Sequence, residues 1–315
     1  MYDIETYRER MSKEREVIPT MLKLFESQGI HATWATVGLL FHSSLEELLE
    51  SLPDIRPTYE NEKLSPYPYI MTSEIEKEEA EDSVHYAKTL VSAIRNTKHQ
   101  ELSTHTYSHY YCLEHGQTGE QFAADLEAAV RCAGKLGIKL NSLVFPRNQC
   151  NEAYIPLLAK YGIKAYRGNP QHWLYESGYS TSDSIIKRIM RLADSFVNIS
   201  GHHCYSYHQF RTEPSANFPA SLFLRPYSRK WKSFERLRQR RLLSAMTHAA
   251  RNGLICHIWW HPYNMAEEME KNMSFLHKLV SHFNWLQSEY GMESKSMSEL
   301  YAVTVERDRL LQKSV

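Results

Sequence analysis

Residues 27–34 read SQGIHATW, in which an amphipathic stretch ends at Gly29 and an apolar residue follows at once. Glycine suits the first position after a helix, since its backbone reaches the left-handed region without a Cβ clash. The same junction recurs in KLGIKLNSLVF, KYGIKAYRGN, RNGLICHIWW and EYGMESKSM, at Gly137, Gly162, Gly253 and Gly291. The sequence therefore predicts several junctions at which a helix ends at a glycine and a strand follows.

Strands that alternate with helices favour a parallel sheet, because a parallel connection needs a long crossover. Right-handed crossovers then wind the strands into a barrel or an open doubly wound sheet. Helical spacing of apolar residues and capping signals predict helices at residues 14–28, 118–136, 151–161, 184–196, 233–252, 265–290 and 298–311. The sequence thus predicts an α/β fold in a single domain over residues 1–315, with excursion loops near 53–82 and 198–232.

The charge and cysteine content narrow the classes of function. Lysine plus arginine equals aspartate plus glutamate, 37 against 37, so no global positive field exists to attract nucleic acid or an anionic membrane. The five cysteines are odd in number and form no C-x-x-C motif, which favours a reducing compartment. No apolar run of about 18 residues predicts a membrane span, and the charged N-terminus lacks the apolar region of a signal peptide. We therefore expect a cytoplasmic protein that does not bind nucleic acid.

Residues 103–109, STHTYSH, place two histidines four residues apart where a strand is expected to end. In folds with parallel strands, ligand and catalytic residues collect at the carboxyl ends of the strands. If the next residues turn, His109 falls on the same side as His105. Imidazole suits zinc and other first-row divalent ions, so one interpretation is a pair of metal ligands. The alternative is a pair of surface or half-buried histidines in a loop.

Two further strand ends carry candidate catalytic residues. In residues 257–264, HIWWHPYN, we interpret His261 as functional, because a histidine at a strand edge can act as general acid or base near neutral pH. We interpret His257 as a core histidine. In residues 142–149, SLVFPRNQ, Arg147 can orient a carboxylate by a two-pronged contact. The alternative for Arg147 is a surface arginine after a turn.

In this order, these segments resemble the polysaccharide deacetylase family, whose fold is the NodB-homology domain. HTYSH matches the family's H-[ST]-x-x-H metal motif, and GIHATWATVG is similar to its second-strand signature. FPRNQ takes the place of its arginine–proline motif in a different order, and IWWH matches its L-x-x-H motif with Ile258 for leucine. SMSEL is similar to its final strand-to-helix turn. The resemblance extends from about residue 14 to residue 302.

The resemblance implies a distorted (β/α) barrel and a divalent metal ion, most often zinc. It implies a hydrolase that removes acetyl groups from amino sugars or other glycans, so the partner is a carbohydrate substrate. By position, it implies His105 and His109 as metal ligands, His261 as the acid that protonates the leaving group, and Arg147 as the residue that holds a catalytic carboxylate. The metal in such a site polarises the acetyl carbonyl and acidifies its bound water.

The chain departs from the family's pattern at its start. Family members carry an aspartate pair, or Asp-x-Glu, at the end of the first strand, where one carboxylate acts as base and another completes the metal site. Here Asp3 and Glu5 imitate that motif, but Met1 and Tyr2 are too few for a strand of about five residues. We therefore expect the first strand and its carboxylates to be missing, with Asp3 as a weak substitute. The two open sheet edges that result would favour self-association.

Two other functions stay open. A catalytically impaired or truncated copy of the same fold would bind glycan without turnover, through aromatic side chains that stack on sugar rings. The candidates for such stacking are Trp34, Trp173, Tyr205, Tyr207, Trp231 and Trp259. An unrelated metallohydrolase on a similar barrel generally needs an H-x-H pair at its first strand, which this sequence does not contain. In any of the metal-binding cases, a third ligand could come from His202, His203 or Cys204 in the second expected loop.

Overall fold

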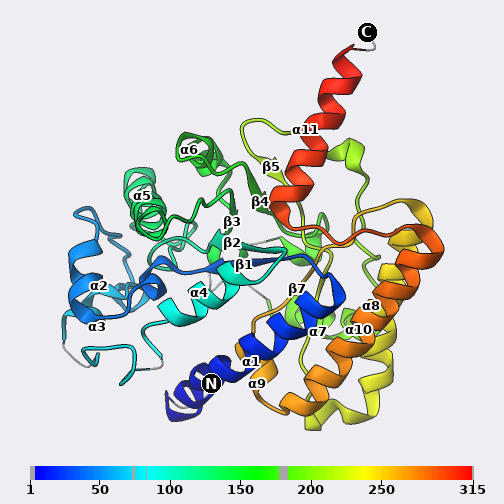
Figure 1. Ribbon diagram of the computed structural model, residues 1–315, viewed down its shortest axis with the longest axis horizontal. Coiled ribbons are helices and arrows are strands. Elements are labelled where there is room, and N and C mark those ends of the chain that lie inside the picture. Colours follow the sequence, from blue (N-terminus) through cyan, green and yellow to red (C-terminus); the bar gives the residue numbers. More distant parts are fainter. Residues whose placement is uncertain (1–3, 73–74, 83, 177–183, 314–315) are drawn as a thin grey trace.

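Five parallel strands form the main sheet, and they lie side by side in the order in which they occur in the chain (Figure 1). The computed structural model describes residues 4–72, 75–82, 84–176 and 184–313. The strands of the main sheet are β1 Ala32–Thr36, β2 Gln100–Thr104, β3 Ser142–Val144, β4 Ala165–Arg167 and β5 Ala216–Asn217. A second, smaller parallel sheet consists of β6 Leu222–Phe223 and β7 Ile258–Trp259. Because the pairs are parallel, the carboxyl ends of the strands in each sheet lie at one edge.

Helices occupy the connections between the strands, and Figure 1 shows them around the central strands. The helices that precede the first four strands are α1 Ile4–Gln28, α4 Lys88–Asn96, α5 Gly119–Lys135 and α6 Ile155–Lys160. The other helices are α2 Leu45–Ser51, α3 Tyr67–Met71, α7 Ile185–Asp194, α8 Glu235–Asn252, α9 Tyr263–Ala266, α10 Met269–Tyr290 and α11 Met297–Lys313. No helix in the described part of the chain is long and apolar enough to cross a bilayer.

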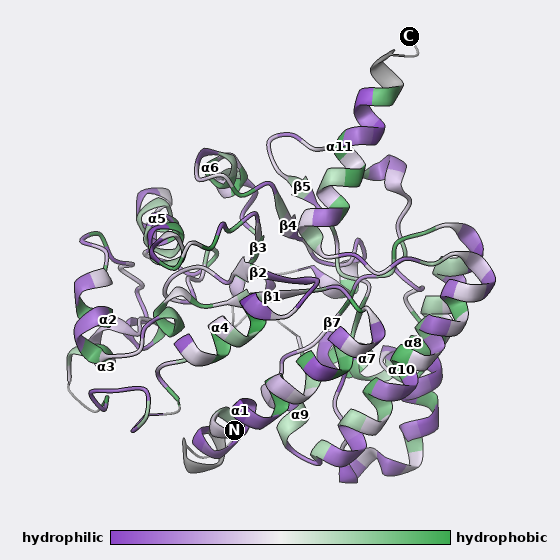
Figure 2. Ribbon diagram, in the orientation of Figure 1, coloured by the Kyte–Doolittle hydropathy of each residue, from purple (hydrophilic) through white to green (hydrophobic). Residues whose placement is uncertain are grey.

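Helix α1 buries one apolar face against both sheets. Val17, Met21 and Phe25 lie one turn apart and are buried, and burial of side chains of this size stabilises by about 1.5–3 kcal/mol each. The ring of Phe25 lies 6.3 Å from that of Trp34 in β1 and 6.2 Å from that of Trp260 after β7. Figure 2 shows hydrophilic and hydrophobic residues alternating along the outer helices, as expected for helices that bury one side.

The predicted junction of helix, glycine and strand is confirmed four times. Helices α1, α5, α6 and α8 are each followed by a glycine with positive φ and then by a strand, at Gly29, Gly137, Gly162 and Gly253. The fifth junction differs, because Gly291 ends α10 but the following residues lead to α11 without forming a strand. Ser294 in this segment bonds instead to the backbone N–H and C=O groups of His31, at 2.9 and 3.1 Å.

The stretches predicted to be excursion loops contain regular structure. Residues 198–232 carry β5 and β6, and residues 53–82 carry α3. Strands of two residues are too short to show an alternating pattern in the sequence. Helix α4 is also absent from the predicted set. The strand order fits an α/β fold with a wound parallel sheet, whereas the closed barrel and the loss of its first strand stay predictions.

Candidate active site

His105 follows the last residue of β2, at the carboxyl edge of the main sheet. Its backbone N–H donates to the carbonyl of Thr36 at the end of β1 (2.9 Å). Its Nδ1 atom lies 2.7 Å from the carbonyl oxygen of Val144 at the end of β3. A carbonyl oxygen only accepts, so Nδ1 carries the proton and Nε2 keeps its lone pair. Metal-binding histidines are commonly oriented by this kind of hydrogen bond from the other ring nitrogen.

The turn after His105 brings His109 back beside it. His109 has a φ of 59°. The buried carboxylate of Asp125 on α5 accepts the backbone N–H groups of Tyr107 (2.7 Å) and Ser108 (3.1 Å), which holds the turn in place. The ring centroids of His105 and His109 lie 4.8 Å apart, with an interplanar angle of 68°. The structure therefore brings the two predicted residues together, while their role as metal ligands stays a prediction.

Burial and nearby positive charge keep the histidines of this edge neutral. Burial, with a smaller effect of the Arg167 charge, lowers the pKa of His261 to about 4. Burial, followed by the charge of Arg147 and by repulsion from His261 when that ring is protonated, lowers the pKa of His109 to about 4. Burial also holds the pKa of His105 well below its usual value. All three imidazoles are thus uncharged at pH 7, which is the form that binds a metal ion.

Arg167, the last residue of β4, is a site residue that the sequence did not reveal. Its guanidinium lies 4.2 Å from the ring centre of Trp259, and its Nη2 donates to the side-chain oxygen of Asn148 (2.7 Å). Its Nε is buried without a hydrogen-bond partner among the described residues, and burial lowers the pKa of the guanidinium to about 9. The signal that could have found Arg167 is its position at the end of a strand that follows a helix–glycine junction.

Arg147 lies in the turn after β3, where it has a φ of 52°. Its guanidinium lies 4.4 Å from the ring centre of Tyr111, and its charge lowers the pKa of His109. It forms no ion pair with a carboxylate of the described residues. The predicted role of holding a catalytic carboxylate therefore has no partner in this part of the chain. Asp3, the weak candidate carboxylate, lies outside the described residues.

His257 lies one residue before β7 and fits the interpretation as a core histidine. Its Nδ1 lies 3.2 Å from the carbonyl oxygen of Phe218. Burial, followed by the charge of Arg167, lowers the pKa of His257 to about 4. The carbonyl contact turns this ring nitrogen toward the backbone of the 198–232 segment.

The loop residues considered as a third ligand make other contacts. The ring of His202 stacks on that of His248, with centroids 4.8 Å apart. His203 lies 2.7 Å from the hydroxyl of Ser200, and the thiol of Cys204 donates to backbone carbonyls. Within the described ranges, no three histidine, cysteine or carboxylate ligand atoms that include those of His105 or His109 lie within 4.8 Å of one another.

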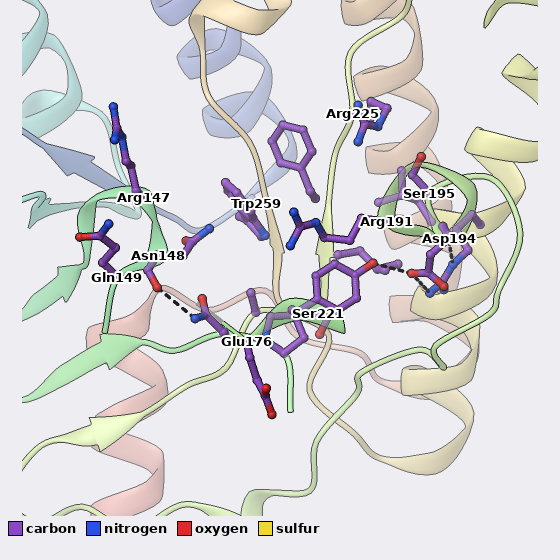
Figure 3. A pocket seen from close by; sticks show the side chains of 18 residues that line it. Arg147, Asn148, Gln149, Glu176, Arg191, Asp194, Ser195, Ser221, Arg225 and Trp259 are labelled. Atoms are coloured by element: carbon purple, nitrogen blue, oxygen red, sulfur yellow. Dashed lines mark hydrogen bonds and ion pairs between the residues drawn. The ribbon is translucent and has the colours of Figure 1, made fainter. Parts of the chain in front are cut away.

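A cavity of about 630 Å³ lies beside the segments that follow β3 and β4, and His105, His109 and His261 are not among the residues that line it (Figure 3). Trp259 lines it, and the rings of Trp259 and His261 lie 5.5 Å apart. Arg147 also lines it, and Figure 3 shows Trp259 between the side of the cavity that carries Arg147 and the side that carries Asp194. Small-molecule sites commonly have volumes of about 300–1,000 Å³, so the cavity is large enough for a sugar-sized ligand.

A buried ion pair forms the side of the cavity away from Arg147. Asp194 at the end of α7 and Arg241 of α8 lie 3.4 Å apart and are both buried. The Asp194 carboxylate also accepts the hydroxyl of Tyr175 (2.6 Å) and the N–H of Ile199 (2.9 Å). These bonds fix the start of the 198–232 segment against α8.

The aromatic residues considered for sugar stacking lie in different environments. Trp259 lines the cavity, with Arg167 over its ring. Trp34 and Tyr205 are buried in hydrophobic clusters. Trp173 is 48% exposed. Of these four, Trp259 is the one whose position suits contact with a ligand in the cavity.

His105 and His109 fit two ligand positions of a divalent metal site. They are adjacent and neutral, and the tautomer of His105 leaves Nε2 available. The described residues add no carboxylate beside them, and the charges of Arg147 and Arg167 oppose a cation. Catalytic zinc sites generally use three protein ligands, so these residues fit a weakly held ion better than a tightly held one.

The parallel sheet, the connecting helices and the histidines at its carboxyl edge define an α/β protein with a polysaccharide deacetylase-like fold. A solved structure titled "putative polysaccharide deacetylase from Mycobacterium smegmatis" aligns with a TM-score of 0.54 at 10% identity, over 94% of this chain and 79% of that chain. The 4-alpha-glucanotransferase from Thermococcus litoralis aligns with a TM-score of 0.38 at 12% identity, over 87% of this chain and 39% of that one. No family model and no curated protein matches the sequence.

Proposed function

We propose that the chain is a metal-dependent hydrolase that removes acetyl groups from an acetylated sugar or polysaccharide. The observation that carries the proposal is the pairing of His105 and His109, with the His105 Nδ1 bonded to Val144 so that Nε2 faces away from the backbone. The deacetylase-like fold supports the same function. His105 and His109 would hold the metal, most often zinc in such sites, and a bound ion would polarise the acetyl carbonyl and acidify a bound water.

The residues around the pair supply the other functions that the reaction needs. His261 is neutral at pH 7, because its pKa is about 4, so it takes up a proton before it can give one to the leaving group. His261 would act as the base when it takes up the proton and as the acid when it releases it. This would replace the carboxylate base, which the described residues do not place beside the histidine pair. Trp259 and Arg147, which line the cavity, would bind and orient the sugar.

A catalytically impaired member that binds glycan is the second candidate. It is favoured by the positive charges of Arg147 and Arg167 beside the histidines and by the lack of a carboxylate there among the described residues. Loss of a general base commonly removes a factor of about 10²–10⁴ in rate. Such a protein would retain the cavity and its aromatic wall but release little acetate.

Acetate release and metal content, measured together, separate the two candidates. For the hydrolase, the zinc-supplied chain releases acetate from acetylated oligosaccharides, and His105→Ala loses both this activity and one equivalent of the divalent ion bound in a metal titration. The matched control is His277→Ala, an exposed histidine on α10, which keeps both. Glycan binding without acetate release by a correctly folded, zinc-supplied chain would support the second candidate and refute the first.

A further inference from the structure

A second cluster of metal-ligating side chains lies at the opposite edge of the main sheet. His31 and His99 are the residues immediately before β1 and β2, and Glu299 lies in the first turn of α11. Ala32 pairs with Gln100 in the parallel register, so the two preceding histidines are neighbours. One ligand atom from each of His31, His99 and Glu299 lies within 4.8 Å of the other two. No other such group occurs among the residues that the structure describes.

The contacts within this cluster hold its metal-ligating atoms close together. The Nδ1 atom of His31 lies 2.8 and 2.7 Å from the two carboxylate oxygens of Glu299. The His31 and His99 rings stack with centroids 4.0 Å apart and an interplanar angle of 12°. The Glu299 carboxylate also accepts the N–H of Ser296 (2.8 Å). Three side chains from segments far apart in the sequence thus meet at one point.

The charge of the cluster suits a cation. Burial acts to raise the pKa of the Glu299 carboxyl, but hydrogen bonds from Ser296 and His31 outweigh it and hold the pKa below its usual value. The carboxylate is therefore ionised at neutral pH. The nearby ammonium of Lys295 pairs with Glu293 (2.6 Å). One negative charge and two imidazoles then face the same space.

We propose that His31, His99 and Glu299 bind a first-row divalent metal ion, with zinc as the reference ion. Two imidazoles and one carboxylate form a donor set that zinc accepts, with a fourth position for water. Ligand atoms at about 2.0–2.1 Å from zinc lie about 3.3 Å from one another, so these atoms need to converge by about 1.5 Å at most. His99 is exposed, and a rotation of its ring provides that movement.

The ion would tie α11 to the starts of β1 and β2. Side-chain bonds already join these elements, since Thr33 of β1 accepts the N–H of Met297 (2.9 Å) and Glu101 of β2 accepts that of Ser298 (2.9 Å). Metal binding to the folded chain alone raises its stability. The site is therefore structural, and it does not depend on the proposed hydrolase activity.

Zinc titration of the full chain tests the proposal. The background is His105→Ala with His109→Ala, which removes the candidate active-site ligands. In this background, calorimetry should find about one bound zinc ion per chain, and zinc should raise the thermal unfolding temperature. His99→Asn and Glu299→Gln should each weaken zinc binding by at least tenfold and remove the thermal shift. Asparagine tolerates the positive φ of 64° at position 99, and glutamine keeps an acceptor for His31.

The control in the same background is His277→Ala, which should bind zinc unchanged. If the variant with His105→Ala and His109→Ala binds no zinc, the proposal is overturned. The cluster would then be only a hydrogen bond between His31 and Glu299 beside two stacked rings. Equal zinc affinity of the background, His99→Asn and Glu299→Gln would also overturn it. Acetate release by otherwise native His99→Asn should stay unchanged, so the failure of either proposal can be recognised separately.

Discussion

The guanidinium of Arg167 lies 4.2 Å from the centre of the indole ring of Trp259, which lines the cavity. Its charge lowers the pKa of His261, in addition to the larger effect of burial. Arg167→Met removes the charge and should raise the pKa of His261 from about 4 toward, but not up to, the ordinary value of about 6.5. Titration of the histidine ring protons by NMR measures this change. The same pKa in Arg167→Met as in the native chain would show that Arg167 does not act on His261.

Gly38 supports the turn that carries His109. A Cβ atom at position 38 would lie 2.6 Å from the Tyr107 ring and 2.9 Å from its Cα atom. The Gly38 N–H also donates to the carbonyl of Thr106 (2.9 Å). Gly38→Ala should therefore lower the free energy of unfolding by about 1–3 kcal/mol and weaken metal binding at His105, as measured by urea denaturation and zinc titration.

The matched control for Gly38→Ala is Gly134→Ala in α5. Nothing lies within 4 Å of a Cβ atom at this exposed helical position. Alanine should stabilise there by about 0.5–1 kcal/mol, because it loses less conformational freedom than glycine on folding. Equal effects of the two substitutions would contradict the close approach of Gly38 to Tyr107.

Removing one partner of the buried ion pair of Asp194 and Arg241 should destabilise the protein strongly. Asp194→Asn leaves the buried Arg241 charge uncompensated, which commonly destabilises by about 3–5 kcal/mol. The double replacement Asp194→Leu with Arg241→Met removes both charges and should cost less than Asp194→Asn. Urea denaturation of the three proteins measures these differences, and a double variant less stable than the single one would refute this account.

The buried His42 should lower the free energy of unfolding in acid. It is 5% exposed, and burial lowers its pKa to about 4, against about 6.5 in the unfolded chain. The unfolded chain therefore binds more protons between these values, so the free energy of unfolding falls as the pH falls from 6.5 toward 4. The shift corresponds to about 3 kcal/mol. In His42→Gln the free energy of unfolding should change less steeply with pH, and the slope should fall by the equivalent of up to one bound proton.

Denaturant unfolding at pH 7, 6, 5 and 4 provides the slopes for this comparison. His277→Gln, at an exposed position of α10, reports the effect of replacing a histidine elsewhere. Parallel slopes for the native chain and His42→Gln would mean that His42 does not titrate differently in the two states.

Local signals in the sequence predicted the part of the fold that depends on single helices and strands. Each of Gly29, Gly137, Gly162 and Gly253 ends a helix where a strand soon follows, since a residue with positive φ marks the boundary. The spacing of His105 and His109 likewise predicted their meeting, because a short turn suffices to bring them together. Strands β5 and β6 have two residues each and leave no periodic signal.

Long-range neighbours were beyond the reach of the sequence. Glu299 meets His31 across 268 positions, and only the packing of the start of α11 against β1 and β2 brings them together. Arg167 was missed for a related reason, because its importance comes from its buried Nε, which has no hydrogen-bond partner in the described part of the chain, and from the stacked Trp259. The role of Arg147 in holding a carboxylate stays a prediction from its motif position, and the structure adds that its guanidinium lies over the ring of Tyr111.

The most direct test of the central claim is a crystal structure of the zinc-loaded protein with data collected at the zinc absorption edge. The account predicts an anomalous peak about 2.0–2.1 Å from Nε2 of His105 and from a ring nitrogen of His109. Zinc at His31, His99 and Glu299 would give a separate peak at the far edge of the sheet. A zinc-loaded crystal with no peak beside His105 and His109, or with their rings turned apart, would contradict the claim.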